Sequence, residues 1–327
     1  MNILFITCGP LGDTVLTTGL LSNLVEKYPQ SRVTIACGPL GTSLFDGLPQ
    51  KEEVIPLVKR KRHGHWIDLW KRVISRKWDI VVDLRNSAVS RLIFANKKYI
   101  KSRGKLDSSK HWVEQNAGVL GLHKNPPDPK IWFSAAQLQQ AKEIIGDQGL
   151  IIGVGPTAGW LPKIWPAAHF IAVLKNLTKA EGYFPNARIC VFGAPGEEDL
   201  ARPVLEAFSG DRVINMVGKA DPGTVAAVLS LCDFYIGNDS GLMHTSAAVG
   251  TMTFGLFGPS PWQNYYPWGK HCGFARTPES FEELTDFPGY HPKTCTQCLM
   301  TSLTVETVKK GIENLFAGKN SEKTAAA

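Results

Sequence analysis

The sequence has no long apolar run, and no stretch approaches the roughly 20 consecutive apolar residues that a bilayer-spanning helix needs. The first six residues are too short for a signal peptide and have no basic start, so we expect them to form a strand. The chain also lacks the glycine fingerprint of nicotinamide dinucleotide sites and the lysine motif of P-loop enzymes. These absences favour a cytoplasmic protein and give no support to either kind of nucleotide site.

Cysteine is present, but its pattern does not suggest disulfides. The seven cysteines are odd in number and several lie inside apolar runs, which favours reduced, buried thiols. Cys295 and Cys298 form one Cys-x-x-Cys pair, with His291 shortly before it. Because zinc sites usually need a second, spaced pair of ligands, this single pair is a weak sign and we expect no bound metal.

Length and charge suggest two domains with an acidic partner. A chain of 327 residues favours two domains of about 150 residues each. The net charge of +7 is uneven, because residues 59–110 contain sixteen Lys or Arg against four Asp or Glu. Tryptophans lie between these cations, as at a membrane interface. The block indicates nucleic acid, anionic lipid or a charged glycan, or else a solvated helix face.

Short β-rich runs alternate with helical stretches, which predicts α/β domains with parallel, doubly wound sheets. We expect domains at 1–148 and 149–318, with a disordered tail at 319–327. Ligands of such domains bind at the carboxyl ends of the strands. The predicted strands are 3–6, 32–37, 79–84, 149–155, 188–193, 233–237 and 252–257, and the predicted helices are 14–28, 166–181, 197–208, 223–230 and 240–249.

The turn after the predicted strand 233–237 is the most informative part of the chain. Asp239, Ser240 and Gly241 open a helix there, which provides free N–H groups, a positive dipole end and a small residue. Such a helix start can hold a phosphorylated ligand, although an ordinary N-cap has the same residues. His244 could donate to a phosphate or sugar oxygen, or could simply be a capping histidine.

Three further turns contain side chains suited to catalysis or binding. Asp13 could be a general base or an acid that complements a helix dipole. Lys163 could reach a diphosphate and stabilise a leaving group, or could be a solvated lysine. Glu197 and Glu198 could accept hydrogen bonds from ribose hydroxyls, or could be surface acids at a helix start.

Together these residues resemble glycosyltransferase family 9, the lipopolysaccharide heptosyltransferases and their relatives, over nearly the whole chain. The resemblance rests on the motifs at residues 12–18, 237–244, 247–251 and 256–260, with a weaker match near the C-terminus. It implies a GT-B fold, in which two Rossmann-like domains face a central cleft. It also implies an N-terminal acceptor domain, a C-terminal nucleotide-sugar domain, and an inverting transfer without a metal or other cofactor.

The resemblance also implies roles for particular residues. Asp13, flanked by Gly12 and Thr14, would deprotonate the acceptor hydroxyl. Lys163 and the backbone around Thr157 and Ser240-Gly241-Leu242 would hold the diphosphate. Asp239 and His244 would contact the donor sugar or its phosphates, and Glu197 or Glu198 the ribose.

The expected reaction moves a heptose from ADP-heptose to an acidic lipopolysaccharide core or a related lipid-linked glycan. The basic run Lys59, Arg60, Lys61 and Arg62 would steer this acceptor, and we expect peripheral association with the inner face of the cytoplasmic membrane rather than nucleic-acid binding. The single hydroxyl in the turn 156–159 and the aromatic segment 262–268 leave the donor sugar open. The alternatives are another nucleotide sugar, such as a UDP-hexosamine, or a non-catalytic nucleotide- or glycan-binding protein of the same fold.

Overall fold

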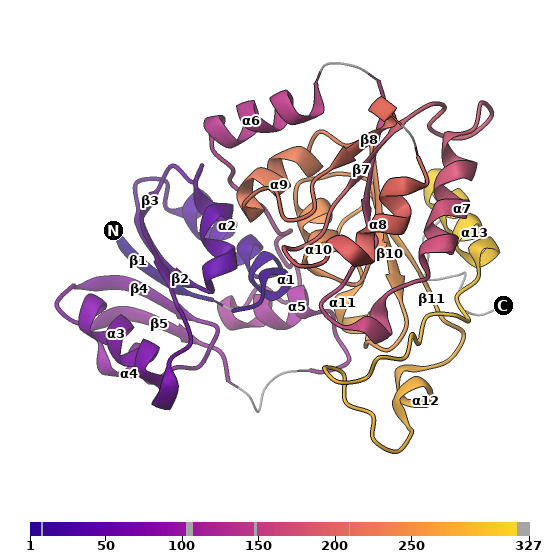
Figure 1. The fold of residues 1–327 in the computed structure, drawn as a ribbon. Helices are drawn as coiled ribbons and strands as arrows, with labels where there is room; N and C mark the ends of the chain where they lie inside the picture. The colour runs from indigo at the N-terminus through magenta and orange to yellow at the C-terminus, as the bar shows by residue number, and fades with distance from the viewer. Residues whose placement is uncertain (8, 103–106, 147–148, 209, 319–327) are drawn as a thin grey trace. The chain divides into compact units, whose positions relative to one another are not determined.

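The computed structural model describes residues 1–327 except 8, 103–106, 147–148, 209 and 319–327 (Figure 1). The chain divides into two compact units. Unit 1 comprises Met1–Gln137 and Asp221–Thr224, and unit 2 comprises Leu138–Ala220 and Val225–Ala327. The predicted disordered tail at 319–327 lies outside the described residues.

Unit 1 is built on a parallel sheet of five strands in the order β3-β2-β1-β4-β5. Leu4 and Ile6 of β1 pack on one face of this sheet, while Ile3 and Phe5 point to the opposite face and are equally buried. Both faces are therefore covered, as expected for a doubly wound sheet. The strands are β1 (Asn2–Ile6), β2 (Arg32–Cys37), β3 (Lys51–Pro56), β4 (Trp78–Asp83) and β5 (Ala95–Ile100).

The prediction of one continuous helix at 14–28 is wrong. The structure has α1 (Leu11–Val15) and α2 (Thr18–Lys27), separated at Leu16 and Thr17. The Thr17 hydroxyl donates to the Thr14 carbonyl at 2.7 Å and lies 2.6 Å from the Thr7 hydroxyl. Threonine hydroxyls that bond to the preceding turn compete with the helical pattern, which accounts for the break.

The remaining helices of this part of the chain include short 3-10 turns. They are η1 (Pro39–Phe45), η2 (Lys61–His63), α3 (Gly64–Val73), α4 (Val89–Leu92), α5 (Trp112–Ala117), η4 (Gly118–Leu120) and α6 (Ala135–Ile145). The helices α3 and α4 cover the same face of the sheet, where Leu69, Val73 and Val89 pack with Leu4 and Ile6 (Figure 1).

Unit 2 is built on a parallel sheet of six strands in the order β11-β10-β9-β6-β7-β8. The four strands predicted for this part of the chain are confirmed to within two residues at each end. The predicted α/β class, with two Rossmann-like domains of parallel sheet, is also confirmed. The strands are β6 (Ile151–Gly155), β7 (Arg188–Val191), β8 (Val213–Asn215), β9 (Phe234–Asn238), β10 (Thr253–Phe257) and β11 (Cys272–Arg276).

One face of the second sheet is covered by α7, α8 and α13, whose apolar residues form a single core with the strands. The helix α7 ends at Thr178, three residues before the predicted end. None of the helices among the described residues is both long enough and apolar enough to cross a membrane. The helices are α7 (Ala167–Thr178), α8 (Glu198–Glu206), α9 (Pro222–Leu229), α10 (Gly241–Ala248), α11 (Trp262–Tyr265), α12 (Phe281–Thr285) and α13 (Val305–Phe316), with short η5 (Leu161–Lys163) and η6 (Gly210–Arg212) turns.

Two glycines at the strand ends make room for a buried tyrosine. A β-carbon on Gly155 would lie 2.1 Å from the Tyr235 hydroxyl, and one on Gly237 would lie 2.4 Å from it. Gly153 and Gly155 lie inside β6, in agreement with the predicted strand at 149–155. These glycines therefore accommodate the Tyr235 ring, and the turn after β6 begins at Pro156.

Candidate active site

A buried ion pair lies at the carboxyl end of the second sheet. Lys163 ends the short η5 turn after β6, and Asp239 directly follows β9. Because β6 and β9 are neighbouring parallel strands, their carboxyl ends meet. The Lys163 Nζ lies 2.6 Å from the Asp239 Oδ2, and the side chains are 16% and 8% exposed. The predicted residues Lys163 and Asp239 thus form one charged pair.

Burial and the ion pair together shift the pKa values of Asp239 and His244. Burial alone would raise the pKa of Asp239, but the Lys163 ammonium and hydrogen bonding from Lys163 and Ser260 bring it below its usual range. Burial lowers the pKa of His244 to about 4, and the Asp239 Oδ1, 3.9 Å from its Nε2, offsets only part of that effect. At neutral pH the site therefore holds one ammonium, one carboxylate and one neutral imidazole.

The helix α10 begins directly beside this pair, as predicted. Ser240 is its N-cap residue with extended backbone, and its side chain makes no capping hydrogen bond. Gly241 and Leu242, the first helical residues, are partly exposed. The first N–H groups of α10 are thus left without a serine cap, and the helix dipole adds positive potential near Lys163. This arrangement can bind an anion.

Buried hydrogen bonds of Asn238 and Trp165, two residues with no predicted role in the site, hold the ion pair in place. The Asn238 Oδ1 accepts from the Trp165 backbone N–H at 3.0 Å, and its Nδ2 donates to the Thr157 carbonyl at 3.5 Å. The Trp165 indole donates to the Leu303 carbonyl at 2.8 Å. Both side chains are fully buried. The turn that carries Lys163 is therefore bonded to β9 and to the chain near α13.

A second set of contacts brackets Lys163 itself. The Leu299 backbone N–H donates to the Pro162 carbonyl at 3.1 Å, and the Cys298 thiol donates to the Ile164 carbonyl at 3.1 Å. Both chain neighbours of Lys163 are thus held by consecutive residues from the C-terminal part of the chain. In the sequence, only the weak C-terminal match to the family drew attention to the segment that contains Cys298 and Leu299. It did not predict that these residues would contact the neighbours of Lys163.

The predicted ribose-binding acids have different surroundings. One oxygen of Glu197, Oε2, accepts from the Thr157 hydroxyl at 2.6 Å and from the Ala194 N–H at 2.8 Å. Glu198 is exposed and accepts from the Gly196 N–H at 3.2 Å. Thr157 and Glu197 therefore belong to one hydrogen-bonded cluster after β6 and β7, whereas Glu198 lies at the surface of α8.

Asp13, Gly12 and Thr14 lie on α1, after the first strand of unit 1. Asp13 is partly buried, and the buried Thr14 hydroxyl donates to the Pro10 carbonyl at 2.9 Å. A β-carbon on Gly41 of η1 would lie 3.0 Å from the Thr14 methyl group, so α1 packs closely on η1. The contacts of Thr14 thus hold the short helix that carries Asp13 in place at the carboxyl end of β1.

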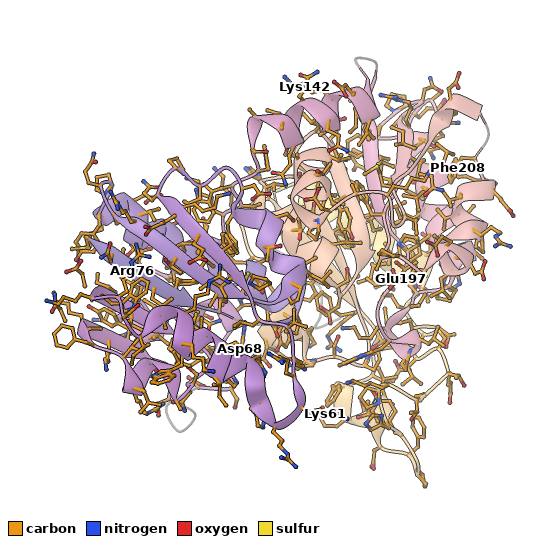
Figure 2. All side chains as sticks on the ribbon, turned by 60° about the vertical axis from the view of Figure 1, so that its left-hand side comes forward. Lys61, Asp68, Arg76, Lys142, Glu197 and Phe208 are labelled. Carbon is orange, nitrogen blue, oxygen red and sulfur yellow. The ribbon has the colours of Figure 1, made fainter. Side chains whose placement is uncertain are left out.

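The four residues of the basic run are exposed. Lys59, Arg60, Lys61 and Arg62 connect β3 to α3, and Arg60 forms an ion pair with Asp68 of α3. Figure 2 labels Lys61 of this run and Asp68 of α3 in unit 1. Solvated cations of this kind suit a large acidic partner rather than a buried ligand.

The geometry of both units agrees with comparisons to known proteins. The model of glycosyltransferase family 9 (heptosyltransferase) matches residues 105–287, which is more than half of the chain. This chain belongs to glycosyltransferase family 9. The glycosyltransferase is 26% identical over 301 residues to lipopolysaccharide heptosyltransferase 2 of Salmonella typhimurium, covering 80% of this chain and 83% of the relative. It is 27% identical over 316 residues to a Campylobacter jejuni lipooligosaccharide heptosyltransferase 2, covering 92% and 96%.

Solved structures share the fold of this glycosyltransferase. A family 9 glycosyltransferase from Veillonella parvula has a TM-score of 0.78 at 24% identity, covering 97% of each chain. The Escherichia coli ADP-heptose lipopolysaccharide heptosyltransferase II has a TM-score of 0.70 at 19% identity, covering 97% of this chain and 99% of that one. The family and the fold therefore agree with the resemblance found in the sequence.

The cysteines of the glycosyltransferase do not gather into a metal centre in the described part of the chain. The Cys298 thiol donates to the Ile164 carbonyl, and the Cys295 thiol lies 3.9 Å from the Gln297 carbonyl. No group of three or more His, Cys, Asp or Glu side chains among the described residues could hold a metal ion. The six described cysteines are free thiols: Cys37, Cys190, Cys232, Cys272, Cys295 and Cys298.

The aromatic segment 262–268 packs mainly on β11. Trp262 and Tyr266 stack on Phe274 with ring centroids 5.1 and 5.8 Å away, and Tyr266 also stacks on Trp268 at 6.2 Å. The ring of Tyr265 lies 6.3 Å from that of His244. The other three aromatic side chains contact one another and the sheet, so the abundance of aromatics does not point to a particular donor sugar.

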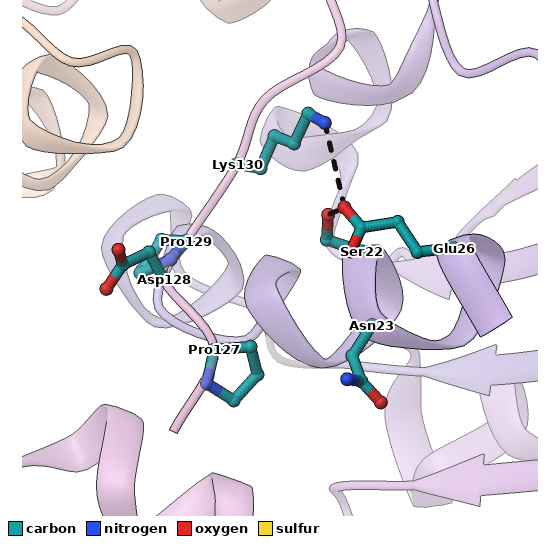
Figure 3. Close-up of a pocket in the computed structure, with 7 residues that line it drawn as sticks. All are labelled: Ser22, Asn23, Glu26, Pro127, Asp128, Pro129 and Lys130. Carbon is teal, nitrogen blue, oxygen red and sulfur yellow. Dashed lines mark hydrogen bonds and ion pairs between the residues drawn. The ribbon is translucent and has the colours of Figure 1, made fainter. Parts of the chain in front are cut away.

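A groove of about 370 Å³ in unit 1 contains none of the predicted site residues (Figure 3). Within it Glu26 accepts from the Ser22 hydroxyl at 2.9 Å and lies 3.9 Å from the Lys130 ammonium. A β-carbon on Gly19 would lie 2.3 Å from the Pro127 carbonyl, so the proline-rich segment packs directly on α2. We interpret these contacts as structural.

Proposed function

We propose that this glycosyltransferase transfers a heptose from ADP-heptose to an acidic lipopolysaccharide core or related lipid-linked glycan, with inversion at the anomeric carbon. The observation that supports the proposal best is the Lys163–Asp239 pair at the start of α10. The names of the relatives agree with heptose as the sugar. One similar enzyme, the Escherichia coli heptosyltransferase WaaC, was solved with ADP and with ADP-2-deoxy-2-fluoro heptose.

On the donor side, the departing ADP gains negative charge as the bond to the sugar breaks. The Lys163 ammonium and the first N–H groups of α10 would stabilise that charge, so the transfer would need no metal. The neutral His244 can donate one N–H to a phosphate or sugar oxygen without adding charge. The backbone around Thr157 would also hold the diphosphate, and Glu197 or Glu198 would contact the ribose.

On the acceptor side, Asp13 would accept the proton of the attacking hydroxyl. The oxygen would then form a bond to the anomeric carbon while the bond from that carbon to the diphosphate oxygen breaks. The position of Asp13 at a helix start favours its ionised form, which a base requires. The exposed cations from Lys59 to Arg62 would attract the acidic acceptor at the inner face of the cytoplasmic membrane.

The substitution Asp13→Asn tests the chemistry. Transfer to acceptor should fall about 10²- to 10⁴-fold, the usual contribution of a general base, while ADP affinity measured by calorimetry stays unchanged. Undiminished turnover would show that Asp13 is not the base. A protein that binds nucleotide but never turns over would instead support the non-catalytic alternative.

The donor is tested separately by thermal shift with ADP, UDP and GDP. ADP should raise the unfolding temperature most, because only a ligand that binds the native state stabilises it. A larger shift with UDP would support the alternative of a UDP-hexosamine donor and would leave the role of Asp13 intact.

A further inference from the structure

Large apolar side chains are exposed on α3 and α4 of unit 1 and on the residues that directly follow these helices. Ile67 and Ile74 are 55% and 37% exposed, and Leu92 and Phe94 are 62% and 65% exposed. Ile93, which lies between Leu92 and Phe94 in the sequence, points the other way and is buried in the core under α3 and α4. We call the set Ile67, Lys71, Ile74, Leu92 and Phe94 the outer α3–α4 surface.

The members of this surface lie together. Ile67, Lys71 and Ile74 have helical spacing of four and three residues, which places them on one face of α3. The opposite face of α3 packs through Leu69 and Val73 on the same core as Ile93. Figure 1 shows α3 and α4 side by side on this sheet face. The exposed residues on and just after both helices therefore lie over the same face of the sheet.

The charge of this region is strongly positive. Residues 57–101 contain thirteen Lys or Arg and only three acids. Asp83 is fully buried and accepts backbone N–H groups, and Asp79 accepts from the Asn2 N–H at 2.7 Å. The third acid, Asp68, is paired with Arg60. Two acids of the neighbouring strand β3, Glu53 and Glu52, pair with Arg72 and Arg76. Exposed cations still outnumber the acids of this region, because Lys59, Lys61, Arg62, Lys71, Lys77, Lys97 and Lys98 are all exposed.

We propose that the outer α3–α4 surface inserts shallowly into an anionic bilayer. Its apolar side chains would enter the boundary between headgroups and acyl chains, and the surrounding cations would meet lipid phosphates. Single exposed apolar residues are common, but a group of them in a segment rich in exposed cations is typical of interfacial helices. Nucleic acid or a dissolved glycan would use the cations and would gain little from Ile67, Leu92 or Phe94.

This inference deepens the proposed function, because it identifies where the enzyme contacts the membrane that carries its acceptor. It does not depend on the transfer chemistry. The variant Asp13→Asn should bind vesicles as the parent does, so failure of one proposal is distinguishable from failure of the other.

The test is co-sedimentation of the full chain with vesicles of phosphatidylcholine alone or with about one third phosphatidylglycerol. The parent should bind only the anionic vesicles. The double variant Leu92→Ser/Phe94→Ser keeps every charge and should lower partitioning about tenfold or more, since two apolar side chains no longer leave water. The matched control is Leu40→Ser, because Leu40 is 61% exposed in the same unit and lies outside this surface.

A charge variant separates the two contributions. Neutralising Lys97 and Lys98 should weaken binding at low salt and matter less at high salt, whereas the Leu92/Phe94 variant should remain impaired at both. Equal binding of the parent and the Leu92/Phe94 variant would overturn the proposed insertion. Tight binding of a single-stranded oligonucleotide without vesicle binding would overturn it in favour of nucleic acid. Circular dichroism confirms that each variant is folded.

Discussion

The two units present charge in opposite ways at the predicted binding regions. In unit 2 the ammonium of Lys163 is mostly buried, paired with Asp239 and held by hydrogen bonds on both sides. In unit 1 the cations from Lys59 to Arg62 are exposed, and the ion pair of Arg60 with Asp68 is solvated. A small ligand with a defined charge needs fixed groups in a desolvated site, whereas a large anionic surface can be met by mobile, solvated cations.

This contrast predicts its largest effect for Lys163→Ala. The variant leaves Asp239 buried without its partner, so the free energy of unfolding should fall by about 3–5 kcal/mol. Transfer should fall about 10²- to 10³-fold, because a charged donor to the leaving group is lost. Urea unfolding and a radiolabelled transfer assay measure the two quantities.

Adding Asp239→Asn to Lys163→Ala provides the control. The double variant should regain most of the lost unfolding free energy and none of the transfer, since only the buried charge is removed. If Lys163→Ala alone has the same free energy of unfolding as the parent, the buried pair does not stabilise unit 2, and the proposed difference between the two units is wrong.

The second prediction concerns pH and His244. Burial lowers its pKa from 6.5 to about 4, so between these values the unfolded chain binds a proton that the folded chain does not. The free energy of unfolding should therefore decrease as pH falls through this window, by a total on the order of 3 kcal/mol. Asp239 has a lowered pKa, so its own contribution to the free energy of unfolding is lost only at still lower pH.

His244→Asn isolates this contribution, because the other histidines are common to both proteins. Denaturant titrations at several pH values should give a smaller slope for the variant between pH 6.5 and 4. Parallel curves for parent and variant would mean that His244 is not held neutral by burial.

A smaller effect is expected for Cys298→Ala, which removes the thiol that donates to the Ile164 carbonyl beside Lys163. A neutral hydrogen bond contributes about 0.5–1.5 kcal/mol, so ADP affinity should fall about two- to tenfold. Cys298→Ser should retain most of the ADP affinity, because the serine hydroxyl can donate the same hydrogen bond. In a Lys163→Ala background the same change should have no effect, and additive losses would contradict a role in positioning Lys163.

The smallest effect is expected for Arg60→Ala. Its pair with Asp68 is exposed, so the free energy of unfolding should change by at most about 1 kcal/mol. Binding to anionic vesicles should weaken slightly and only at low salt. A loss comparable to that of Lys163→Ala would remove the contrast between the two units.

Sequence reasoning found every inner strand of both sheets and missed β3, β5, β8 and β11. These four are the edge strands of the two sheets. Inner strands of parallel sheets are buried on both faces and are therefore continuously apolar, whereas edge strands are partly solvated. The strand β3 contains three charged residues in six and β8 has only three residues, so neither has a clear pattern.

The candidate site was predictable in part for a similar reason. Asp239 and Lys163 stand out because each lies in a turn after a strand, and the adjacency of those strands then brings them together. Asn238, Trp165 and Cys298 act through contacts with residues 73 to 138 positions away. Such contacts depend on tertiary packing, and a local pattern of residues does not encode them.

The Lys163–Asp239 pair also bears on how the spent nucleotide leaves. Before any ligand arrives, the charge of the lysine is already balanced by a buried carboxylate. In the proposed reaction an incoming diphosphate shares that ammonium with a permanent competitor. The liberated ADP, more negative than the donor it came from, would be repelled by the same carboxylate, and its escape would thereby be hastened.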